Sequence, residues 1–228
     1  MSVNNSVMIS DSIQQIYPGA RVGVLALELS PRKDSLFTMN ERMKEFILAL
    51  KAKYPEPITL KKNEVIEAYT TYYKKFKKTY HLIPQLESVI FHEKKINSPI
   101  PLLQAVFTAE LKNMLLTAVH DLDTIQFPIT IGLASGEENY QLLNGSETFT
   151  KFGDMYMSDR SGVISSIIHG PDLRTKVTPK TSDALIVVYA PDGIGEERVG
   201  RHFEDIISMI ELISENPKLT FRRILPEN

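Results

Sequence analysis

Cations and hydroxyl groups crowd the chain just before one apolar segment near its C-terminal end. Residues 169–182 read HGPDLRTKVTPKTS and lead into the buried-strand pattern ALIVVYA. A guanidinium can fork onto a phosphate or a carboxylate, and an ammonium adds a point charge. Arg174 and Lys176, with Asp172 beside them, are therefore candidates for binding a nucleotide or an aminoacyl terminus. The alternative is that Arg174 pairs inside the protein with Asp172 or Asp121.

Three more polar positions could serve either catalysis or the fold. Asn97 could donate to a carbonyl or orient a water molecule, and its alternative role is to cap a helix. His120 could act as a base near neutral pH, or it could be a satisfied structural residue. Asp121 and Asp123 can accept backbone donors where a helix gives way to a strand, and Asp121 is also a candidate for substrate binding.

Several kinds of site are excluded or disfavoured by composition. The chain has no cysteine, which excludes disulfides, thiolate nucleophiles and cysteine-bound metals. Its five histidines never pair at the spacing that metal ligands need. It also lacks a glycine-rich phosphate loop, a dinucleotide fingerprint and a nucleophile elbow. We therefore expect neither a metal nor another cofactor.

Charge is unevenly distributed along the chain. Residues 61–95 hold eight lysines against four acidic residues, whereas residues 192–215 hold seven acidic residues against two arginines. The first region predicts an RNA-binding surface, whose candidate residues are Lys74, Lys75, Lys77 and Lys78, or alternatively a solvated helix face. The aromatic residues between these lysines could stack on bases or belong to the core; they are Tyr72, Tyr73, Phe76 and Tyr80.

Periodicity predicts separate groups of helices and strands. The expected helices cover residues 34–54, 63–78, 85–94, 101–116 and 195–216, and the expected strands include 21–29, 184–190 and 219–225. Between residues 128 and 168, short apolar segments separated by Gly, Asn and Asp are typical of a strand meander. We predict one α+β domain over residues 1–228, with a helical part at about 30–116 and a strand-rich part at about 117–228.

The N-terminal sequence bears on where the protein resides. Its first 20 residues lack the basic start and apolar run of a secretory signal. The early apolar block at residues 22–29 is far shorter than the roughly 20 residues needed to cross a bilayer. We expect a cytoplasmic protein without a membrane partner.

Four short sequence features occur in an order that is typical of a known family. They are Asn97 before a helix, Asp121-Leu122-Asp123 after it, Asp159 with Gly162, and Arg174-Thr175-Lys176-Val177-Thr178 with Thr181. This order resembles the B-three/B-four domain of the phenylalanyl-tRNA synthetase beta subunit, and more closely the freestanding proteins built from that domain alone. The resemblance covers about residues 20–225.

This resemblance implies a fold and an activity. The family fold is an irregular β-sandwich with helices around it, and within the synthetase the domain hydrolyses the ester of tyrosine wrongly joined to the phenylalanine tRNA. The position that matches the synthetase's histidine is Ala118, with His120 two residues further along. The synthetase domain also contains a Gly-Gly-Glu stretch. The region that matches it here is HGPD, in which Asp172 could replace the glutamate.

Three functions remain open from the sequence. The first is a trans-acting aminoacyl-tRNA deacylase, without aminoacylation activity, that uses Asn97 and His120. The second is a non-catalytic tRNA-binding or RNA-binding module, and the third is a protein that binds a small molecule such as an amino acid. The sequence does not indicate an oligomeric state.

Overall fold

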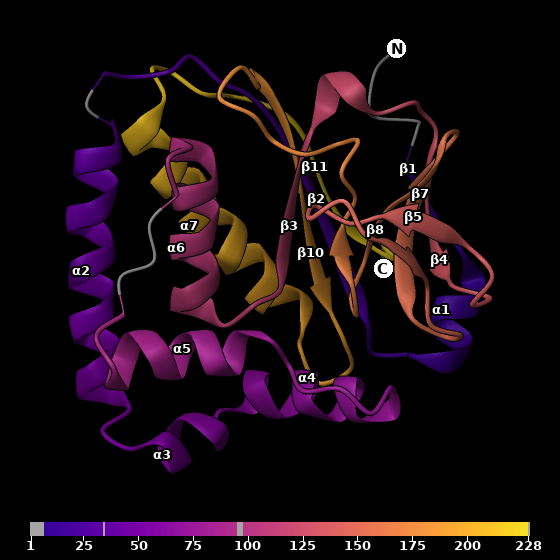
Figure 1. Cartoon of the computed structure of the whole chain (residues 1–228), viewed down its shortest axis with the longest axis horizontal. Helices are drawn as coiled ribbons and strands as arrows, with labels where there is room; N and C mark the ends of the chain where they lie inside the picture. The colour runs from indigo at the N-terminus through magenta and orange to yellow at the C-terminus, as the bar shows by residue number, and fades with distance from the viewer. Residues whose placement is uncertain (1–6, 34, 95–97, 228) are drawn as a thin grey trace.

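The computed structural model describes residues 7–33, 35–94 and 98–227, and it confirms the predicted α+β class. Helices α2, α6 and α7 form one layer, a four-stranded sheet the next, and a five-stranded sheet the third (Figure 1). The helices are α1 (Asp11–Ile16), α2 (Ser35–Lys53), α3 (Pro57–Lys61), α4 (Glu64–Lys75), α5 (Leu82–Phe91), α6 (Pro101–Asn113) and α7 (Glu196–Ile213).

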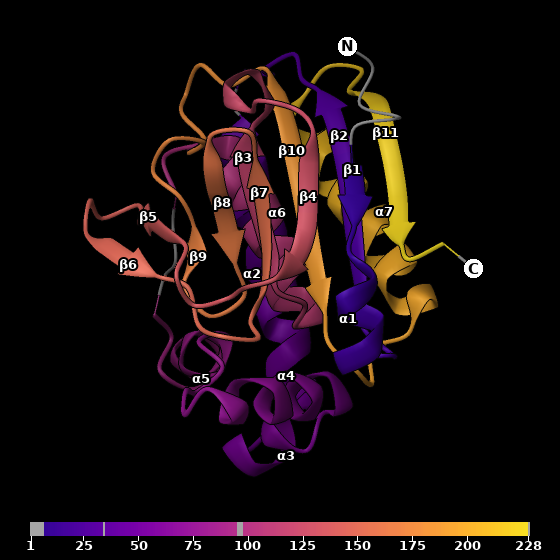
Figure 2. The same ribbon diagram turned by 90° about the vertical axis from the view of Figure 1, so that its right-hand side faces the viewer.

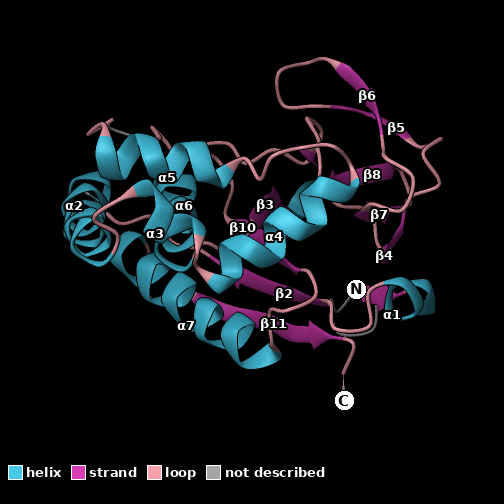
Figure 3. Ribbon diagram, turned by 90° about the horizontal axis from the view of Figure 1, so that it is seen from below, coloured by secondary structure: helices cyan, strands magenta, loops and turns pink. Residues whose placement is uncertain are grey.

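The four-stranded sheet contains the most apolar strands of the chain. Its order is β11 (Lys218–Leu225), β2 (Arg21–Glu28), β10 (Asp183–Ala190) and β3 (Thr117–Asp121), all antiparallel. The central strands β2 and β10 are buried on both faces because helices cover one face and the second sheet covers the other (Figure 3). A Cβ at Gly23 would lie 2.5 Å from the Phe203 ring, so the absence of a side chain there lets α7 pack on β2.

The five-stranded sheet is built from shorter strands. Its order is β1 (Val7–Ile9), β4 (Ile129–Leu133), β7 (Met155–Asp159), β8 (Gly162–Ser166) and β9 (Gly170–Pro171), and β1 pairs with β4 in parallel. The hairpin of β5 (Asn139–Gln141) and β6 (Glu147–Phe149) projects from this sheet (Figure 2). The two sheets thus form the expected sandwich, with its second layer made of short, irregular strands.

A cap of tyrosines joins the small helices α3–α5 to the sheets. The hydroxyl of Tyr73 donates to the carbonyl of Ile167, and that of Tyr80 donates to the carbonyl of Met114. Tyr72 donates to Asp154, a buried carboxyl whose pKa is raised to about 7 because it is removed from water. Because all three tyrosines are buried, they take the core role rather than the stacking role.

Several element boundaries differ from the sequence prediction. The helix expected over residues 101–116 ends at Asn113, because Met114 adopts a left-handed conformation with φ of 61° and the chain enters β3 three residues later. The helix expected over residues 85–94 covers Leu82–Phe91 instead, and α1, α3 and β3 were not predicted. Asn63 does cap α4 as expected, since its side chain accepts from the backbone N–H of Val65 at 2.9 Å.

Candidate functional site

Arg174 is bound to acidic partners at the surface of the second sheet. Its guanidinium forks onto Asp159, with 2.9 Å from Nη1 to Oδ2 and 2.9 Å from Nη2 to Oδ1. It also donates to the carbonyl of Thr124, and its Nε lies 3.6 Å from Asp172 Oδ2. The Arg174 side chain is 34% exposed while that of Asp159 is 0% exposed. Of the two partners considered from the sequence, Asp172 lies near Arg174, and Asp121 bonds Thr181 instead. The main partner, Asp159, was not considered as one.

Asp172, Thr175 and His120 form a buried chain of hydrogen bonds next to this pair. Asp172 accepts from the backbone N–H of Thr175 at 3.1 Å and from its hydroxyl. That hydroxyl donates its hydrogen to Asp172. It therefore accepts a hydrogen bond from Nδ1 of His120, 2.8 Å away. Burial raises the pKa of the Asp172 carboxyl.

His120 is buried on β3 and its Nε2 has no partner among the described residues. Burial lowers the pKa of its imidazole to about 3, and the nearby charge of Arg174 adds to that effect. The imidazole is thus neutral near pH 7, with its hydrogen on the nitrogen that faces Thr175. The bond through Nδ1 agrees with a structural role for His120, although Nε2 is unsatisfied, and its role as a base stays a prediction.

Asp121 holds the end of β3 to the segment that follows Thr175. Its backbone N–H donates to the carbonyl of Thr175 at 2.8 Å, and its carboxylate accepts from the Thr181 hydroxyl at 2.6 Å. The same carboxylate caps a 3₁₀ turn by accepting from the backbone N–H of Asp123 at 3.2 Å. We call the connected set Asp121, Asp159, Asp172, Arg174 and Thr175 the Arg174 cluster.

A pocket of about 310 Å³ lies next to this segment, at the edge of β3. Its walls are mostly apolar, and α6 supplies Leu103, Val106 and Phe107. Val177 and Pro171 close the opposite wall, and Leu143 from the turn between β5 and β6 also lines it. Lys176 is the positively charged residue among those that line the pocket, and it is exposed. We call this cavity the β3-edge pocket.

Glu110 is the acidic residue of the β3-edge pocket, and it was not among the candidates predicted from the sequence. It lies on α6, is only 6% exposed, and accepts from the backbone N–H of Thr117 at 3.0 Å through Oε1. Burial raises the pKa of its carboxyl to about 8. The only sequence signal was an acid among the apolar positions of a predicted helix, in TAELKNM.

The neutral imidazole of His202 is hydrogen-bonded to the Thr117 hydroxyl. Asn113 Nδ2 donates to Nδ1 of His202 at 2.9 Å, and the Thr117 hydroxyl donates to the Leu115 carbonyl. That hydroxyl must therefore accept from Nε2 of His202, 2.8 Å away. Burial lowers the pKa of the imidazole to about 3. Thr117 thus connects α7 to the carboxyl of Glu110.

The outer edge of β3 supplies backbone groups to the pocket. Thr117 and Asp121 turn their N–H groups away from β10, toward Glu110 and the Thr175 carbonyl respectively. Alternate residues of a strand direct their backbone groups to the same side. The N–H and C=O of Val119, which lines the pocket, therefore face this edge as well.

The four candidate RNA-binding lysines lie together at the end of α4 and in the turn after it, and all four are exposed. The ammonium of Lys75 lies 4.3 Å from the centre of the Tyr17 ring. Lys74 lines a shallow groove that also contains Glu67 and Glu87. The surface is thus accessible, with acidic residues on its α4–α5 side.

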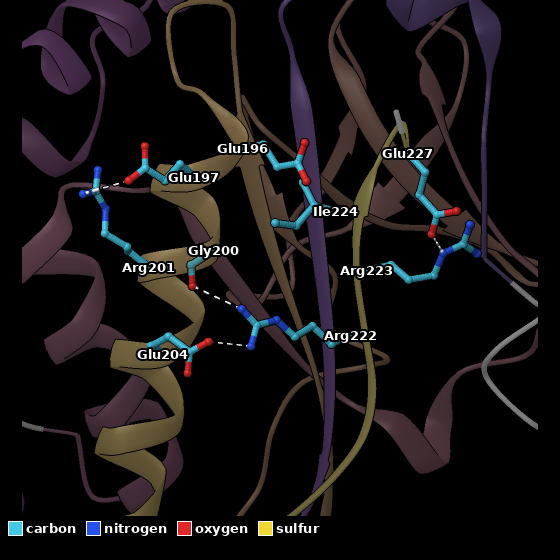
Figure 4. A pocket seen from close by; sticks show the side chains of 9 residues that line it. All are labelled: Glu196, Glu197, Gly200, Arg201, Glu204, Arg222, Arg223, Ile224 and Glu227. Atoms are coloured by element: carbon cyan, nitrogen blue, oxygen red, sulfur yellow. Dashed lines mark hydrogen bonds and ion pairs between the residues drawn. The ribbon is translucent and has the colours of Figure 1, made fainter.

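A larger groove of about 990 Å³ lies between α7 and β11 (Figure 4). Its charges neutralise one another across the groove and along its rims. Arg222 pairs with Glu204 at 2.6 Å, Arg223 pairs with Glu227, and Arg201 lies 3.3 Å from Glu197. This groove therefore presents paired charges, whereas the β3-edge pocket presents apolar walls with a buried acid.

Three further expectations from the sequence concern Asn97, metal binding and a membrane partner. Asn97 lies outside the described residues. Within residues 7–33, 35–94 and 98–227, no group of three or more His, Asp or Glu side chains is arranged to hold a metal ion. In the same ranges, no helix combines the length and the apolar character needed to cross a membrane.

These layers define an α+β protein with a sandwich of two sheets covered by helices on one side. The sequence matches no protein-family model, and no curated protein matches it. The fold is similar to that of an N-terminal fragment of the phenylalanyl-tRNA synthetase beta subunit from Pyrococcus horikoshii, with a TM-score of 0.51 and 14% identity. The similarity covers 97% of this chain and 54% of that fragment, so this chain spans about half its length. At this identity the likeness shows the fold alone.

Proposed function

We propose that the protein binds the aminoacyl end of a tRNA in the β3-edge pocket and hydrolyses its ester bond, as a freestanding aminoacyl-tRNA deacylase. The observation that supports this most is the pocket itself, which combines apolar walls, the buried carboxyl of Glu110 and the cation of Lys176. It occurs in a chain whose fold is similar to a fragment of a tRNA synthetase subunit.

The chemistry requires little beyond positioning. In deacylation, water attacks the ester carbonyl carbon, the bond to the ribose oxygen breaks, and that oxygen takes a proton. An enzyme assists by holding the ester still and by stabilising negative charge on the carbonyl oxygen. In this proposal the N–H of Val119 donates to that oxygen, Lys176 binds the phosphate of the terminal nucleotide, and the apolar walls hold the amino-acid side chain.

The residues selected from the sequence divide between two roles in this proposal. Lys176 contacts the substrate, and Asn97 stays the sequence-based candidate for orienting the water. Asp172, Arg174 and His120 act as positioning residues, because their hydrogen bonds fix the segment that carries Lys176.

A panel of mischarged tRNAs tests the proposal. We expect the purified chain to release the amino acid from at least one of them, and Lys176→Ala to lower the rate about tenfold, as for the loss of one charged contact. Lys180→Ala is the matched control, because Lys180 is exposed in the same loop but does not line the pocket. A panel that stays fully acylated at micromolar protein would refute the deacylase.

A second candidate function is RNA binding without hydrolysis, and the exposure of Lys74, Lys75, Lys77 and Lys78 favours it. Each phosphate that such a lysine neutralises releases counterions, so affinity should fall steeply with salt. Changing all four to Glu should weaken tRNA binding and flatten the salt dependence. The same change at Lys33, Lys44, Lys53 and Lys218, which are also exposed, is the matched control. Equal affinity in both quadruple variants would exclude this surface.

A further inference from the structure

Glu110 has one carboxyl oxygen engaged and the other free for a ligand. Oε1 accepts from the backbone N–H of Thr117 at 3.0 Å, which fixes the carboxyl at the pocket wall. No described group hydrogen-bonds Oε2, although the residue is only 6% exposed. Oε2 is not fully buried, so its remaining contact is with solvent in the pocket, and such limited hydration is less favourable than a hydrogen bond to a fixed donor. A ligand donor in the pocket would supply the missing partner.

The surroundings of Glu110 contain no cation bonded to it. On its own helix, Lys112 is engaged with Asp205 of α7 at 2.6 Å. His202 of α7 is neutral and is separated from the carboxyl by Thr117. The remaining titratable groups near the carboxyl are the buried hydroxyls of Tyr69, Tyr73 and Tyr80, and Lys176 lies in the opposite loop. The positive charge that would stabilise an ionised Glu110 is therefore absent from its described neighbours.

The pocket thus contains an acidic group and a cation on walls that come from different elements. α6 contributes the carboxyl of Glu110, and the segment after Arg174 contributes the exposed ammonium of Lys176. The edge of β3 adds a backbone donor and a backbone acceptor at Val119 between these walls. A ligand that carries an ammonium group next to a carbonyl matches this polarity, because its ammonium meets the acceptor while its carbonyl meets the donors.

We propose that Glu110 is the specificity residue of the β3-edge pocket and binds the α-ammonium group of the aminoacyl ligand. This inference rests on the proposed function of the pocket and adds which atom of the substrate is recognised. In the empty pocket the carboxyl keeps its proton. When the ammonium docks, that proton leaves to solvent and a charge-assisted pair forms between Oε2 and the ligand nitrogen. Acyl groups without an amino group are then rejected.

Binding of matched ligand pairs tests this assignment. The probes are L-phenylalaninamide against 3-phenylpropanamide, and L-leucinamide against 4-methylpentanamide, so that each pair differs only in the amino group. We expect the wild-type chain to prefer the amino compound of a pair about tenfold, in line with one charged hydrogen bond. Calorimetry at about pH 6 in two buffers of different ionisation enthalpy should also show close to one proton released.

Variants separate recognition from structure. Glu110→Gln keeps an oxygen for the Thr117 N–H, so it should fold, lose the tenfold preference and release no proton. Glu211→Gln changes an exposed acid on α7 and should leave both readouts unchanged. Lys176→Ala should weaken both ligands of a pair equally, so that the preference stays.

The outcomes distinguish two kinds of failure. Equal binding of both ligands of a pair by the wild-type chain would overturn the role of Glu110 and leave the pocket as a ligand site. An unchanged preference in Glu110→Gln would overturn it in the same way. Failure of every probe to bind the wild-type chain, together with a mischarged panel left intact, would overturn the proposed function as well.

Discussion

The Arg174 cluster and the β3-edge pocket share the segment from Pro171 to Val177, and their polar atoms are used in opposite ways. In the cluster, each carboxylate has partners within the protein: Asp159 has Arg174, and Asp172 has Thr175. In the pocket, Glu110 has a single backbone donor and Lys176 is exposed. Groups that satisfy each other hold a fold together, whereas groups left short of partners can bind something else. This difference is the basis for the proposal that the cluster stabilises the fold while the pocket binds a ligand.

The largest effect should come from breaking the Arg174 cluster. Arg174→Ala removes the cation from the buried carboxylate of Asp159, which keeps the backbone N–H donors of Gln126 and Ser161. Breaking a fully buried pair costs up to about 5 kcal/mol, and since Arg174 is 34% exposed we expect about 3 kcal/mol. Urea denaturation of the wild type and the variant measures this. Arg201→Ala, which removes an exposed pair with Glu197, should cost less than about 0.5 kcal/mol. If Arg174→Ala kept full stability and lost only ligand binding, the Arg174 cluster would be part of the ligand site and not a stabilising contact.

Glu110 should make the protein less stable as the pH rises. Its folded pKa of about 8 lies above the value near 4.5 expected for an unfolded chain, so the folded state holds a proton that the unfolded state has lost. The free energy of unfolding should therefore fall between about pH 5 and pH 8, by roughly 2 to 4 kcal/mol from this residue. Asp154 contributes with the same sign near its pKa of about 7.

The variant Glu110→Gln isolates that contribution. Denaturation of both proteins across the pH range should give curves that converge in acid and separate in base, with the variant more stable in base. Parallel curves would show that Glu110 is already ionised in the folded protein and has a cation that satisfies it.

His120 should act on the acid side and with the opposite sign. Its folded pKa of about 3 lies below the usual value of 6.5, so the unfolded chain takes up a proton first and stability falls as the pH drops below 6.5. His120→Asn, which can keep the donor to Thr175, should remove about 2 kcal/mol of the loss between pH 6.5 and pH 5. His202 has the same shift and remains in the variant, so part of the acid sensitivity should persist.

The smallest change in stability should come from Lys176→Ala. Its ammonium is exposed and forms no ion pair with a described residue, so the free energy of unfolding should change by less than about 0.5 kcal/mol. The thermal stabilisation that an aminoacyl amide gives to the wild type should shrink in this variant. A large loss of stability would place Lys176 with the Arg174 cluster and not with the pocket.

The sequence was most informative where periodicity and local chemistry agree. The strands at residues 21–29 and 184–190 were recognisable because both faces are buried, which gives an uninterrupted apolar run. Asn63 was recognisable as a helix cap because its side chain serves its own helix. By contrast, β3 was not predicted and the helix before it was extended to residue 116, since the boundary depends on the left-handed turn at Met114.

The site was predicted only in part because spatial proximity decides it. The resemblance rested on Asp121, Asp159 and Arg174, and these residues bind one another or their neighbours. Lys176 was selected with them and lines the pocket. Glu110 was missed because acidic residues are common in helices. Its burial results from a contact with β3 that residue spacing along the helix does not predict.

The turn between β5 and β6 carries Leu143 into the pocket, and while its base pairs with the segment around Asp172, its tip is closed by hydrogen bonds within the hairpin. The N–H of Leu142 donates to the Ser146 carbonyl, and the N–H of Gly145 donates back to the Leu142 carbonyl. The tip of the turn, beyond Leu142, can therefore lengthen or shorten while the base of the hairpin keeps its contacts. The depth of the cavity is thereby adjustable by insertion or deletion at a single place, so proteins of this architecture could acquire different substrates while keeping an unchanged frame.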